Sequence, residues 1–443
     1  KGETMDVIVS FIDAITFVLA TYWVIRGLKR LLNTQRTVYF VLILFYIIYI
    51  LPVGIDYFIT YPSYETWKQF QGFYVSYNDK LTRVIYDVWM IVTYHLIEKI
   101  GSGRLAFRVS NRIIGGSTGL LEKKDTLDEN ISDGIYYLLF ALSCLPIILV
   151  VIKKLPTGIL FTPLWLDSGL YNITGTSLEV PYYFLQKLSY ISIVAAFLCL
   201  VNGKHRNIIV KIFLVLVIYA LTCLEAKRAI YAIVLIMLIS YLFISAKLKR
   251  KTKFLILILS VLGVVGLLSF TTEHMMQYRH YGITYNPVNT YTQIKMDFMR
   301  DDRVKFVIYK ALNFEGIVQY PCQSYLTQLT ALFPLDLFFP VEGFNKYFTA
   351  ALLGVERGSV GGWVTTSIFD EALANMGIFS LIIIPLILGL IALYTDEASD
   401  NVKVIAIVAV ALLFMLNLGY IMWYLQFCFI ILYMDHKIRV KEG

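Results

Sequence analysis

Residues 378–394, IFSLIIIPLILGLIALY, form a run of seventeen residues without a charged side chain. A helix needs about 20 mainly apolar residues to cross the hydrocarbon core of a bilayer, and similar blocks recur along the chain. Hydrophobic residues make up 58% of the 443 positions and charged residues 16%, whereas soluble domains are less apolar and carry more charge. The sequence therefore predicts an all-α, polytopic integral membrane protein and excludes an ordinary soluble domain.

About eleven transmembrane helices can be drawn from the apolar blocks, and they make the whole chain, 1–443, a single integral membrane domain. The third span is short and contains Asp87, and the last two are separated by the step 417–419. The predicted spans are 6–25, 38–58, 84–98, 134–152, 182–202, 207–223, 229–246, 254–271, 366–394, 403–418 and 420–434.

The distribution of Lys and Arg over the connecting loops predicts the orientation of the spans. Cytoplasmic loops of membrane proteins are enriched in these residues. The connections that contain Arg30, Lys249 and Lys437 form the richer set, so we expect them in the cytoplasm, with the N-terminus outside and the C-terminus inside. The net charge of +8 follows from this bias and does not indicate a nucleic-acid partner.

The predicted loop 272–364 is the longest connection and lies on the extracytoplasmic side. Connections of this length are usually functional or disordered. Its many aromatic residues favour a folded loop, in which 304–312 is expected to be helical. The stretch 325–339 is expected to be either a helix or a re-entrant apolar segment. We expect this loop to form part of an active site.

Arg228 lies in the sequence CLEAKRAIY, residues 223–231, at the outer ends of two predicted spans. An arginine at membrane depth is costly and usually faces a cavity, a charged partner or an anionic ligand. Its planar guanidinium suits phosphate oxygens. The alternative is an interfacial arginine that pairs with Glu225 or extends to the lipid headgroups. The sequence leaves both interpretations open.

The sequence YRHYG, residues 278–282, combines an Arg-His pair with aromatic neighbours. Arg279 could bind a pyrophosphate, and Tyr281 could stack on a sugar ring. His280 could accept a proton near neutral pH, because the pKa of an unperturbed imidazole is about 6.5. These residues are therefore candidates for catalysis and substrate binding.

Arg300 and Arg303 follow among aspartates at positions 297, 301 and 302. Either arginine could bind an anionic substrate, or both could form ion pairs with these aspartates on the protein surface. We expect the surface ion pairs for Arg300 and retain Arg303 as a substrate-binding candidate.

A glycine-rich turn with Arg357 and Trp363 precedes a helix that is expected to begin near Thr365 or Thr366. No lysine follows Gly361-Gly362 in the pattern of a nucleotide-binding P-loop. Arg357 and Trp363 are candidates for binding an anion and a sugar, respectively.

Ser367, Glu371 and Asn375 are spaced four residues apart, so we expect them on one face of that helix. A partly desolvated carboxylate close to arginines is a plausible general base. Asp370 lies about 100° away around the helix from Glu371. We therefore favour Glu371 as the base, with Ser367 and Asn375 beside it in the substrate site.

Several kinds of site are missing from the sequence. His, Cys and Asp residues do not occur at metal-ligand spacing, and there is no dinucleotide fingerprint. The largest predicted cytoplasmic loop, 98–133, is too short to form a nucleotide-binding domain. We expect neither a metal nor a cofactor, and a substrate that reaches the protein through the membrane.

The sequence resembles the Wzy family of bacterial O-antigen and oligosaccharide repeat-unit polymerases. The resemblance lies in the layout of the whole chain and in two local patterns, which are Lys227-Arg228-Ala229 at the start of a span and the glycine-rich turn followed by TTSIFDE (365–371), Asn375-Met376-Gly377 and an apolar helix. Some members also have a glycine eleven residues after an arginine of the outer loops, and this sequence lacks that pattern.

The resemblance implies a GT-C-like fold in the bacterial cytoplasmic membrane, with an active site on the periplasmic side. The implied reaction transfers a glycan from undecaprenyl pyrophosphate to a sugar hydroxyl of a new lipid-linked repeat unit. Arg228, Arg279 and Arg357 would neutralise the pyrophosphate, Glu371 or His280 would accept the proton, and Trp363 and the loop tyrosines would hold sugars. Implied partners are lipid-linked oligosaccharides, membrane lipids and a chain-length regulator protein.

Three alternatives remain. An O-antigen ligase shares the layout but transfers the glycan to a lipid A core. A lipid-phosphosugar glycosyltransferase would need a paired acidic motif in the first outer loop, where only Asp56 lies at the edge. A lipid-linked oligosaccharide flippase is the alternative that is not an enzyme, and it would favour charged residues within spans and short loops.

Overall fold

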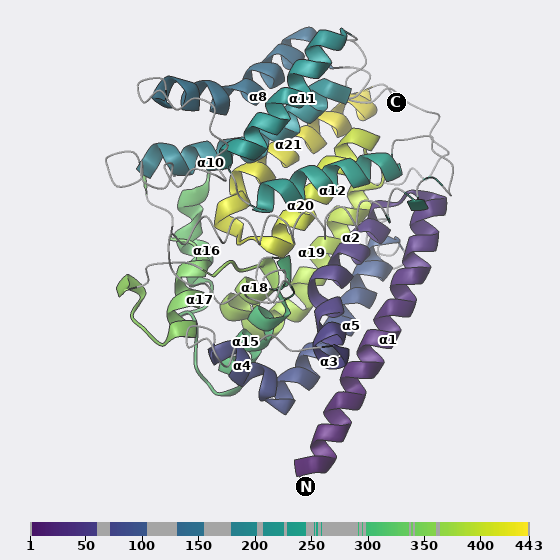
Figure 1. Ribbon diagram of the computed structural model, residues 1–443, viewed down its shortest axis with the longest axis vertical. Helices are drawn as coiled ribbons and strands as arrows, with labels where there is room; N and C mark the ends of the chain where they lie inside the picture. Colours follow the sequence, from purple (N-terminus) through teal and green to yellow (C-terminus); the bar gives the residue numbers. More distant parts are fainter. Residues whose placement is uncertain are drawn as a thin grey trace. The chain divides into compact units, whose positions relative to one another are not determined.

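The computed structural model is helical wherever regular structure is described (Figure 1). The prediction of an all-α chain is confirmed for these residues. The described residues are 2–59, 71–103, 131–154, 179–201, 207–225, 228–244, 252, 254–255, 258, 291, 295, 298–335, 338–339, 342–359 and 364–441.

Four helices within the described ranges are long and apolar enough to cross a membrane. They are Val7–Thr34, Thr37–Phe58, Ile368–Thr395 and Leu418–Ile438. They coincide with the first, second, ninth and eleventh predicted spans. Shorter apolar helices lie at the fourth to seventh predicted spans, namely Asp133–Leu149, Lys187–Val201, Ile208–Leu221 and Ile233–Ile244. This architecture is that of an α-helical membrane protein, while the total of eleven spans and the outer location of the long loop stay predictions.

The chain divides into two compact units. The first comprises Lys1–Ser117, Val288–Glu397 and Val410–Ile421, and the second comprises Thr118–Pro287, Ala398–Ala409 and Met422–Gly443. Helices α20 (Asp400–Met415) and α21 (Leu418–Lys441) contribute to both units.

The first unit contains most of the buried polar residues of the described ranges, together with the candidate membrane helices Val7–Thr34, Thr37–Phe58 and Ile368–Thr395. In it, α5 packs against α1, α2, α15 and α19. The elements of this unit are α1 (Gly2–Thr34), α2 (Thr37–Phe45), the π-helical turn η1 (Tyr46–Ile50), α3 (Leu51–Phe58), α4 (Gln71–Asn78), α5 (Lys80–Gly101), α15 (Asp301–Leu312), α16 (Gln323–Gln328), η6 (Leu329–Ala331), α17 (Phe344–Leu353), η8 (Arg357–Ser359), α18 (Ile368–Met376), η9 (Gly377–Phe379) and α19 (Ser380–Thr395).

Glycines allow α5 and α19 to approach each other closely. A Cβ atom at Gly389 of α19 would lie 2.7 Å from the Cβ of Ile100 in α5, and a Cβ at Gly101 of α5 would lie 3.3 Å from the Cβ of Ala392 in α19 and 2.5 Å from Cγ2 of Val38 in α2. Small residues at such positions let membrane helices gain van der Waals contact along their backbones. Larger side chains at Gly101 or Gly389 would therefore separate these helices.

Aromatic rings fill the centre of the first unit. The ring of Tyr49 lies 4.8 Å from the ring of Phe369 and 5.7 Å from the ring of Phe414, centroid to centroid. The ring of Trp89 lies 5.8 Å from that of Phe369. Residues from α5, α18, α20 and the π-helical turn therefore share one core.

The described part of the predicted outer loop is folded. Its predicted helix 304–312 is confirmed as the greater part of α15. Helix α15 packs on α4, and an apolar core forms there from Phe73, Phe306, Val307, Phe344, Tyr347, Phe348 and Leu352. The stretch 325–339 does not form one helix, because its described residues contain the end of α16, η6 and turns.

The second unit contains α8 (Asp133–Lys154), α10 (Glu179–Val201), α11 (Ile208–Glu225) and α12 (Arg228–Ile244). Helix α10 packs against α8 and α11. Ser192 Oγ of α10 donates a 2.7 Å hydrogen bond to the carbonyl of Leu142 in α8. Along α11, Ile209, Phe213 and Leu216 are exposed, as expected of side chains that face lipid.

Candidate functional site

The second membrane helix is interrupted by the π-helical turn Tyr46–Ile50. In such turns some backbone carbonyls lose their α-helical hydrogen bonds. Within a membrane these carbonyls must accept hydrogen bonds from other protein groups. The Arg300 backbone N–H donates to Ile48 O at 3.1 Å, and the Tyr86 hydroxyl donates to Tyr49 O at 2.5 Å. The interruption is thus bonded to α5 and to the residue that precedes α15.

A second interruption separates α20 from α21. On the α20 side, Arg300 donates Nη2–H and Nε–H to the carbonyl of Met415, at 2.8 and 3.2 Å. On the α21 side, the backbone N–H of Leu418 donates to Glu371 Oε2 at 3.0 Å. A cation at a helix C-terminus and an anion at a helix N-terminus both match the helix dipoles. Arg300 and Glu371 therefore stabilise the two ends of the break.

Glu371 is fully buried in α18, and its carboxylate accepts three hydrogen bonds. Besides Leu418 N–H at Oε2, Gln328 Nε2–H and the Ser324 hydroxyl donate to Oε1, at 2.5 and 3.2 Å. Two donors come from α16 and one from α21, so the carboxylate joins three helices. Since an unpaired buried carboxylate is very costly, these donors explain how Glu371 is tolerated there.

Asn375 lies on the same face of α18 as Glu371, as their spacing predicts. Its side-chain oxygen accepts from Ser324 N–H at 3.0 Å, and its Nδ2–H groups donate to Ser324 Oγ and Glu371 O, each at 2.7 Å. Glu371 and Asn375 together hold α16 against α18.

Ser367 does not belong to this face, so that part of the prediction is wrong. Ser367 is the N-cap of α18, with an extended backbone (φ −134°, ψ 175°), and helical spacing does not apply to it. Its backbone N–H donates to Asp370 Oδ1 at 2.6 Å, and its hydroxyl donates to the same oxygen. The backbone N–H of Asp370 donates in return to the Ser367 side chain, which completes a capping box. Asp370 is thus the partner of Ser367 and fixes the start of α18.

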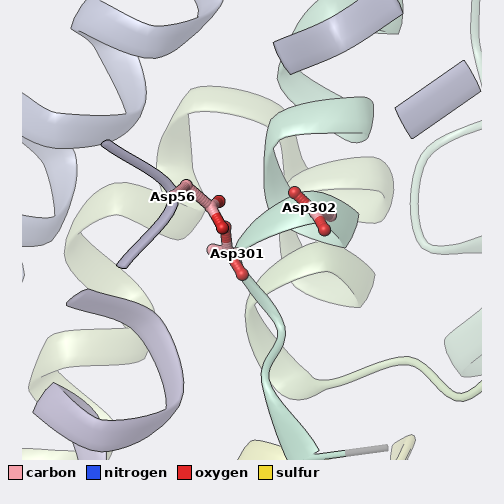
Figure 2. Close-up of side chains that lie close together, drawn as sticks. All are labelled: Asp56, Asp301 and Asp302. Carbon is pink, nitrogen blue, oxygen red and sulfur yellow. The ribbon is translucent and has the colours of Figure 1, made fainter. Parts of the chain in front are cut away.

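A buried ion cluster lies at the start of α15. We define it as Asp56, Lys295, Asp301, Asp302 and Lys305, and all five residues are buried. The Lys295 ammonium contacts Asp56 Oδ2 and lies 3.1 Å from Asp301 Oδ2 and 3.2 Å from Asp302 Oδ1. The Lys305 ammonium lies 2.8 Å from Asp301 Oδ2. Figure 2 shows Asp56 and Asp301 with their carboxylates directed toward one another, and Asp302 on the next position of the helix.

The three carboxylates of the ion cluster are close enough to bind a cation. One oxygen from each of Asp56, Asp301 and Asp302 lies within 4.8 Å of the others. The Lys295 ammonium contacts all three carboxylates, so an internal cation already supplies positive charge at their centre. This grouping could not be seen in the sequence spacing, because 239 positions separate Asp56 from Lys295.

The aspartates of the ion cluster differ in their electrostatic surroundings. Burial opposes ionisation of Asp301, but the ammonium groups of Lys295 and Lys305 outweigh it and lower its pKa to about 2. Burial and the adjacent Asp301 carboxylate raise the pKa of Asp302 above its usual range. Asp302 Oδ2 also lacks a hydrogen-bond donor within the described residues. The surroundings thus favour the charged form of Asp301 and disfavour the charged form of Asp302.

The surface location expected for Arg300 is wrong, because its side chain is buried, as is that of Arg303. Arg300 caps α20, as described above. Arg303 donates Nε–H to Thr365 O at 3.0 Å and Nη1–H to Met299 O at 2.9 Å. Arg303 thereby ties α15 to the segment before α18, and its role in substrate binding stays a prediction.

Arg357 lies in η8 with its side chain 40% exposed. Its Nη1 lies 3.6 Å from Glu342 Oε2, and its guanidinium lies 4.5 Å from the centre of the Tyr347 ring. An arginine stacked on an aromatic ring keeps N–H donors in the plane of the guanidinium for an anionic ligand. Its predicted role in binding pyrophosphate is compatible with this position.

The remaining predicted residues cannot be placed around Glu371. Arg228 is the first residue of α12 in the second unit, and its side chain is not described. Arg279, His280, Tyr281 and Trp363 lie outside the described residues. Among the predicted residues, the structure therefore brings together Glu371 and Asn375, with Ser367 on the same helix.

Sequence reasoning missed several residues of the site. The two aspartates of RDDRVK, residues 300–305, are typical of the first turn of a helix. Nothing in this sequence indicates that its charged side chains are buried. Ser324 and Gln328 are spaced four residues apart and share one face of α16, which was a usable signal. The buried role of Lys295 and Asp56 depends on tertiary packing alone.

No protein-family model, curated protein sequence or solved structure matches the chain. The site is therefore interpreted from its own residues and from the sequence patterns given above.

Proposed function

We propose that the protein is a membrane glycosyltransferase of the Wzy type in the bacterial cytoplasmic membrane. Its donor is a glycan on undecaprenyl pyrophosphate, and its acceptor is a sugar hydroxyl of another lipid-linked repeat unit. The active site faces the periplasm, and a chain-length regulator is a partner. The proposal rests on the sequence resemblance and on the surroundings of Glu371.

The observation that carries the proposal is the position of Glu371. This buried carboxylate lies within the membrane helix Ile368–Thr395, in the segment that shows the resemblance. Ionisable residues inside membrane helices are rare and usually functional. The hydrogen bond from the Ser324 hydroxyl, at 3.2 Å, is the longest of the three that Glu371 accepts. An acceptor hydroxyl that replaced this donor would place its proton within reach of the carboxylate.

In the proposed reaction, the acceptor oxygen forms a bond to the anomeric carbon of the donor glycan as the bond from that carbon to the pyrophosphate oxygen breaks. Glu371 accepts the hydroxyl proton, with His280 as the alternative base. Arg228, Arg279 and Arg357 stabilise the negative charge that develops on the pyrophosphate. Undecaprenyl pyrophosphate leaves with the bonding electrons. Trp363 and Tyr281 hold sugars.

A cellular experiment tests the proposal. Glu371→Gln and Arg357→Ala are expressed in polymerase-deficient cells that make lipid-linked repeat units, and the glycan ladder is analysed. We expect Glu371→Gln to remove the ladder and Arg357→Ala to shorten it. The control is Glu315→Gln, which alters an exposed carboxylate. Normal ladders in Glu371→Gln cells with an equal amount of membrane protein would refute the assignment of the base. A ligase would be recognised by glycan transfer to lipid A core without ladder formation.

A flippase is a second candidate, because membrane helices other than the one that carries Glu371 also contain buried charged residues. Asp13 lies in Val7–Thr34 and forms an ion pair with Arg83, and Asp56 lies in Thr37–Phe58. Interrupted helices and buried charges also occur in transporters. If the protein is a flippase, Asp56→Asn will deplete lipid-linked repeat units from the outer leaflet. If it is a polymerase, single units will accumulate there.

A further inference from the structure

The segment 326–339 exposes an unusual number of large apolar side chains. We call these side chains the apolar loop surface, and Phe338 is the most exposed of them at 75%. A soluble surface seldom groups such residues without a partner. The apolar loop surface consists of Leu326, Leu329, Phe333, Leu335, Phe338 and Phe339.

Charge is nearly absent from this part of the sequence. Between Glu315 and Glu342, the one charged residue is Asp336, and there is no Lys or Arg. A loop that projected into water would normally carry more charge. Tyr320 and Tyr325 lie in the same stretch, and tyrosines are enriched where proteins meet the membrane–water interface.

The backbone of the segment limits how deeply it can enter a membrane. Helix α16 has six residues and η6 has three, and turns follow them. Turns expose backbone N–H and C=O groups that hydrocarbon cannot satisfy. The interfacial layer of a bilayer contains water and polar headgroups and accepts such a backbone, so this layer fits the segment better than the hydrocarbon core.

The start of the segment adjoins a membrane helix. The backbone N–H of Cys322 donates to Asn375 O at 3.0 Å, one turn before Ile378 and Phe379. Both of these side chains are highly exposed, and they belong to the candidate membrane span Ile368–Thr395. The residue that precedes α16 is therefore bonded to a candidate membrane span, which presents exposed apolar side chains of its own one turn further along.

Helix α16 has an inner and an outer face. Ser324 and Gln328 bind the Glu371 carboxylate, so the inner face is fixed to α18. Leu326 of α16 and Leu329 of the adjoining η6 are exposed instead. Since α16 is anchored through its polar face, these leucines cannot turn inward without breaking these bonds. Their exposure is therefore built into the packing of α16.

We propose that the apolar loop surface inserts into the interfacial layer of the lipid bilayer, beside the membrane helix Ile368–Thr395. Its partner is the lipid at the level of the glycerol groups and the first methylenes of the acyl chains. Burial of Leu326, Phe338 and their neighbours in this layer removes their apolar surface from water. The inference does not depend on the proposed glycosyltransferase activity.

Depth-dependent fluorescence quenching tests this proposal. An environment-sensitive fluorescent amino acid replaces Phe338, and the full-length protein is reconstituted into phosphatidylcholine–phosphatidylglycerol vesicles. The vesicles contain lipid brominated either near the glycerol or near the chain terminus. Matched probes replace Phe314, an exposed aromatic residue outside the segment, and Tyr22, an exposed aromatic residue within the span Val7–Thr34.

We expect the probe at 338 to be quenched several-fold more strongly by lipid brominated near the glycerol than the probe at 314. Iodide in the water should quench the probe at 338 less than the probe at 314. Strong quenching by iodide without quenching by lipid at 338 would overturn the proposal, because the surface would then lie in water. Protection of 338 from both quenchers would also overturn it, because another protein surface would then cover the segment. Quenching at 22 by either lipid verifies the insertion of the protein.

Discussion

Glu371 and Asp302 are both fully buried acids near the start of a helix, but they differ in the number of hydrogen-bond donors around them. Glu371 accepts a hydrogen bond from each of three donors, and these donors join α16, α18 and α21. Asp302 has Lys295 beside one oxygen and no donor for the other within the described residues. Burial alone therefore does not distinguish the two acids. The number of donors does: three hydrogen bonds tie the Glu371 carboxylate to the neighbouring helices, whereas burial and the adjacent Asp301 carboxylate disfavour the charged form of Asp302.

Lys295→Met gives the largest effect that we expect. The substitution removes the ammonium that contacts three buried carboxylates, and loss of one partner from a buried ion pair costs about 3–5 kcal/mol. The thermal unfolding midpoint of the detergent-solubilised protein measures this loss. Lys310→Met is the matched control, because Lys310 pairs with the exposed Glu315 and such pairs contribute at most about 1 kcal/mol. Equal midpoints for the two variants would show that the ion cluster does not stabilise the fold.

Asp301→Asn and Asp302→Asn separate the two aspartates of α15. Asp301 binds both Lys295 and Lys305, so its neutralisation should cost about 3 kcal/mol. The surroundings of Asp302 disfavour its charged form, so the neutral side chain in Asp302→Asn should cost less stability than Asp301→Asn does. Chemical unfolding of the two variants in the same detergent provides the comparison. A greater loss for Asp302→Asn would mean that Asp302 is the ionised member.

The pH dependence of stability gives a third test. The folded state raises the pKa of Asp302, so its proton contributes stability that is fully present below the unfolded pKa of about 3.9 and is lost as pH rises through the folded pKa. The slope from Asp302 is at most about 1.4 kcal/mol per pH unit. Asp301 has the opposite sign, because its contribution is present above the unfolded pKa and is lost as pH falls toward about 2. Unfolding midpoints measured upward from pH 4 should therefore decline less in Asp302→Asn than in the unmodified protein. Identical slopes of unfolding midpoint against pH in the variant and the unmodified protein would show that a group other than Asp302 binds the proton.

Ser324→Ala tests the other half of the comparison with the smallest expected effect. The variant loses the bond to Glu371 and the acceptor for Asn375 Nδ2, while Gln328 and Leu418 still bind the carboxylate. We expect a loss of about 1 kcal/mol, measured by thermal unfolding. Thr327→Ala is the control, since Thr327 bonds to the carbonyls of Ser324 and Glu342 and does not touch Glu371. A loss above that of Lys295→Met would mean that Glu371 depends on this one donor.

The sequence was sufficient to predict helices where apolar residues form long runs, because local composition decides whether a helix can cross a membrane. The face shared by Glu371 and Asn375 also followed from helical spacing. Ser367 was placed wrongly, because the helix was expected to begin near Thr365 or Thr366 and begins at Ile368, which leaves Ser367 as its N-cap. The ion cluster could not be predicted, since Asp56 and Asp301 come from distant parts of the sequence and meet only through packing.

The most direct test of the central claim is the rate of glycosyl transfer by the purified Glu371→Gln variant. This rate is measured from the undecaprenyl pyrophosphate that is released from a lipid-linked repeat unit. General base catalysis contributes about 10²–10⁴-fold. We predict a rate at least about 100-fold below that of Glu315→Gln, with both variants unfolding at similar temperatures. A rate within about tenfold of Glu315→Gln would contradict the role of Glu371 as the base.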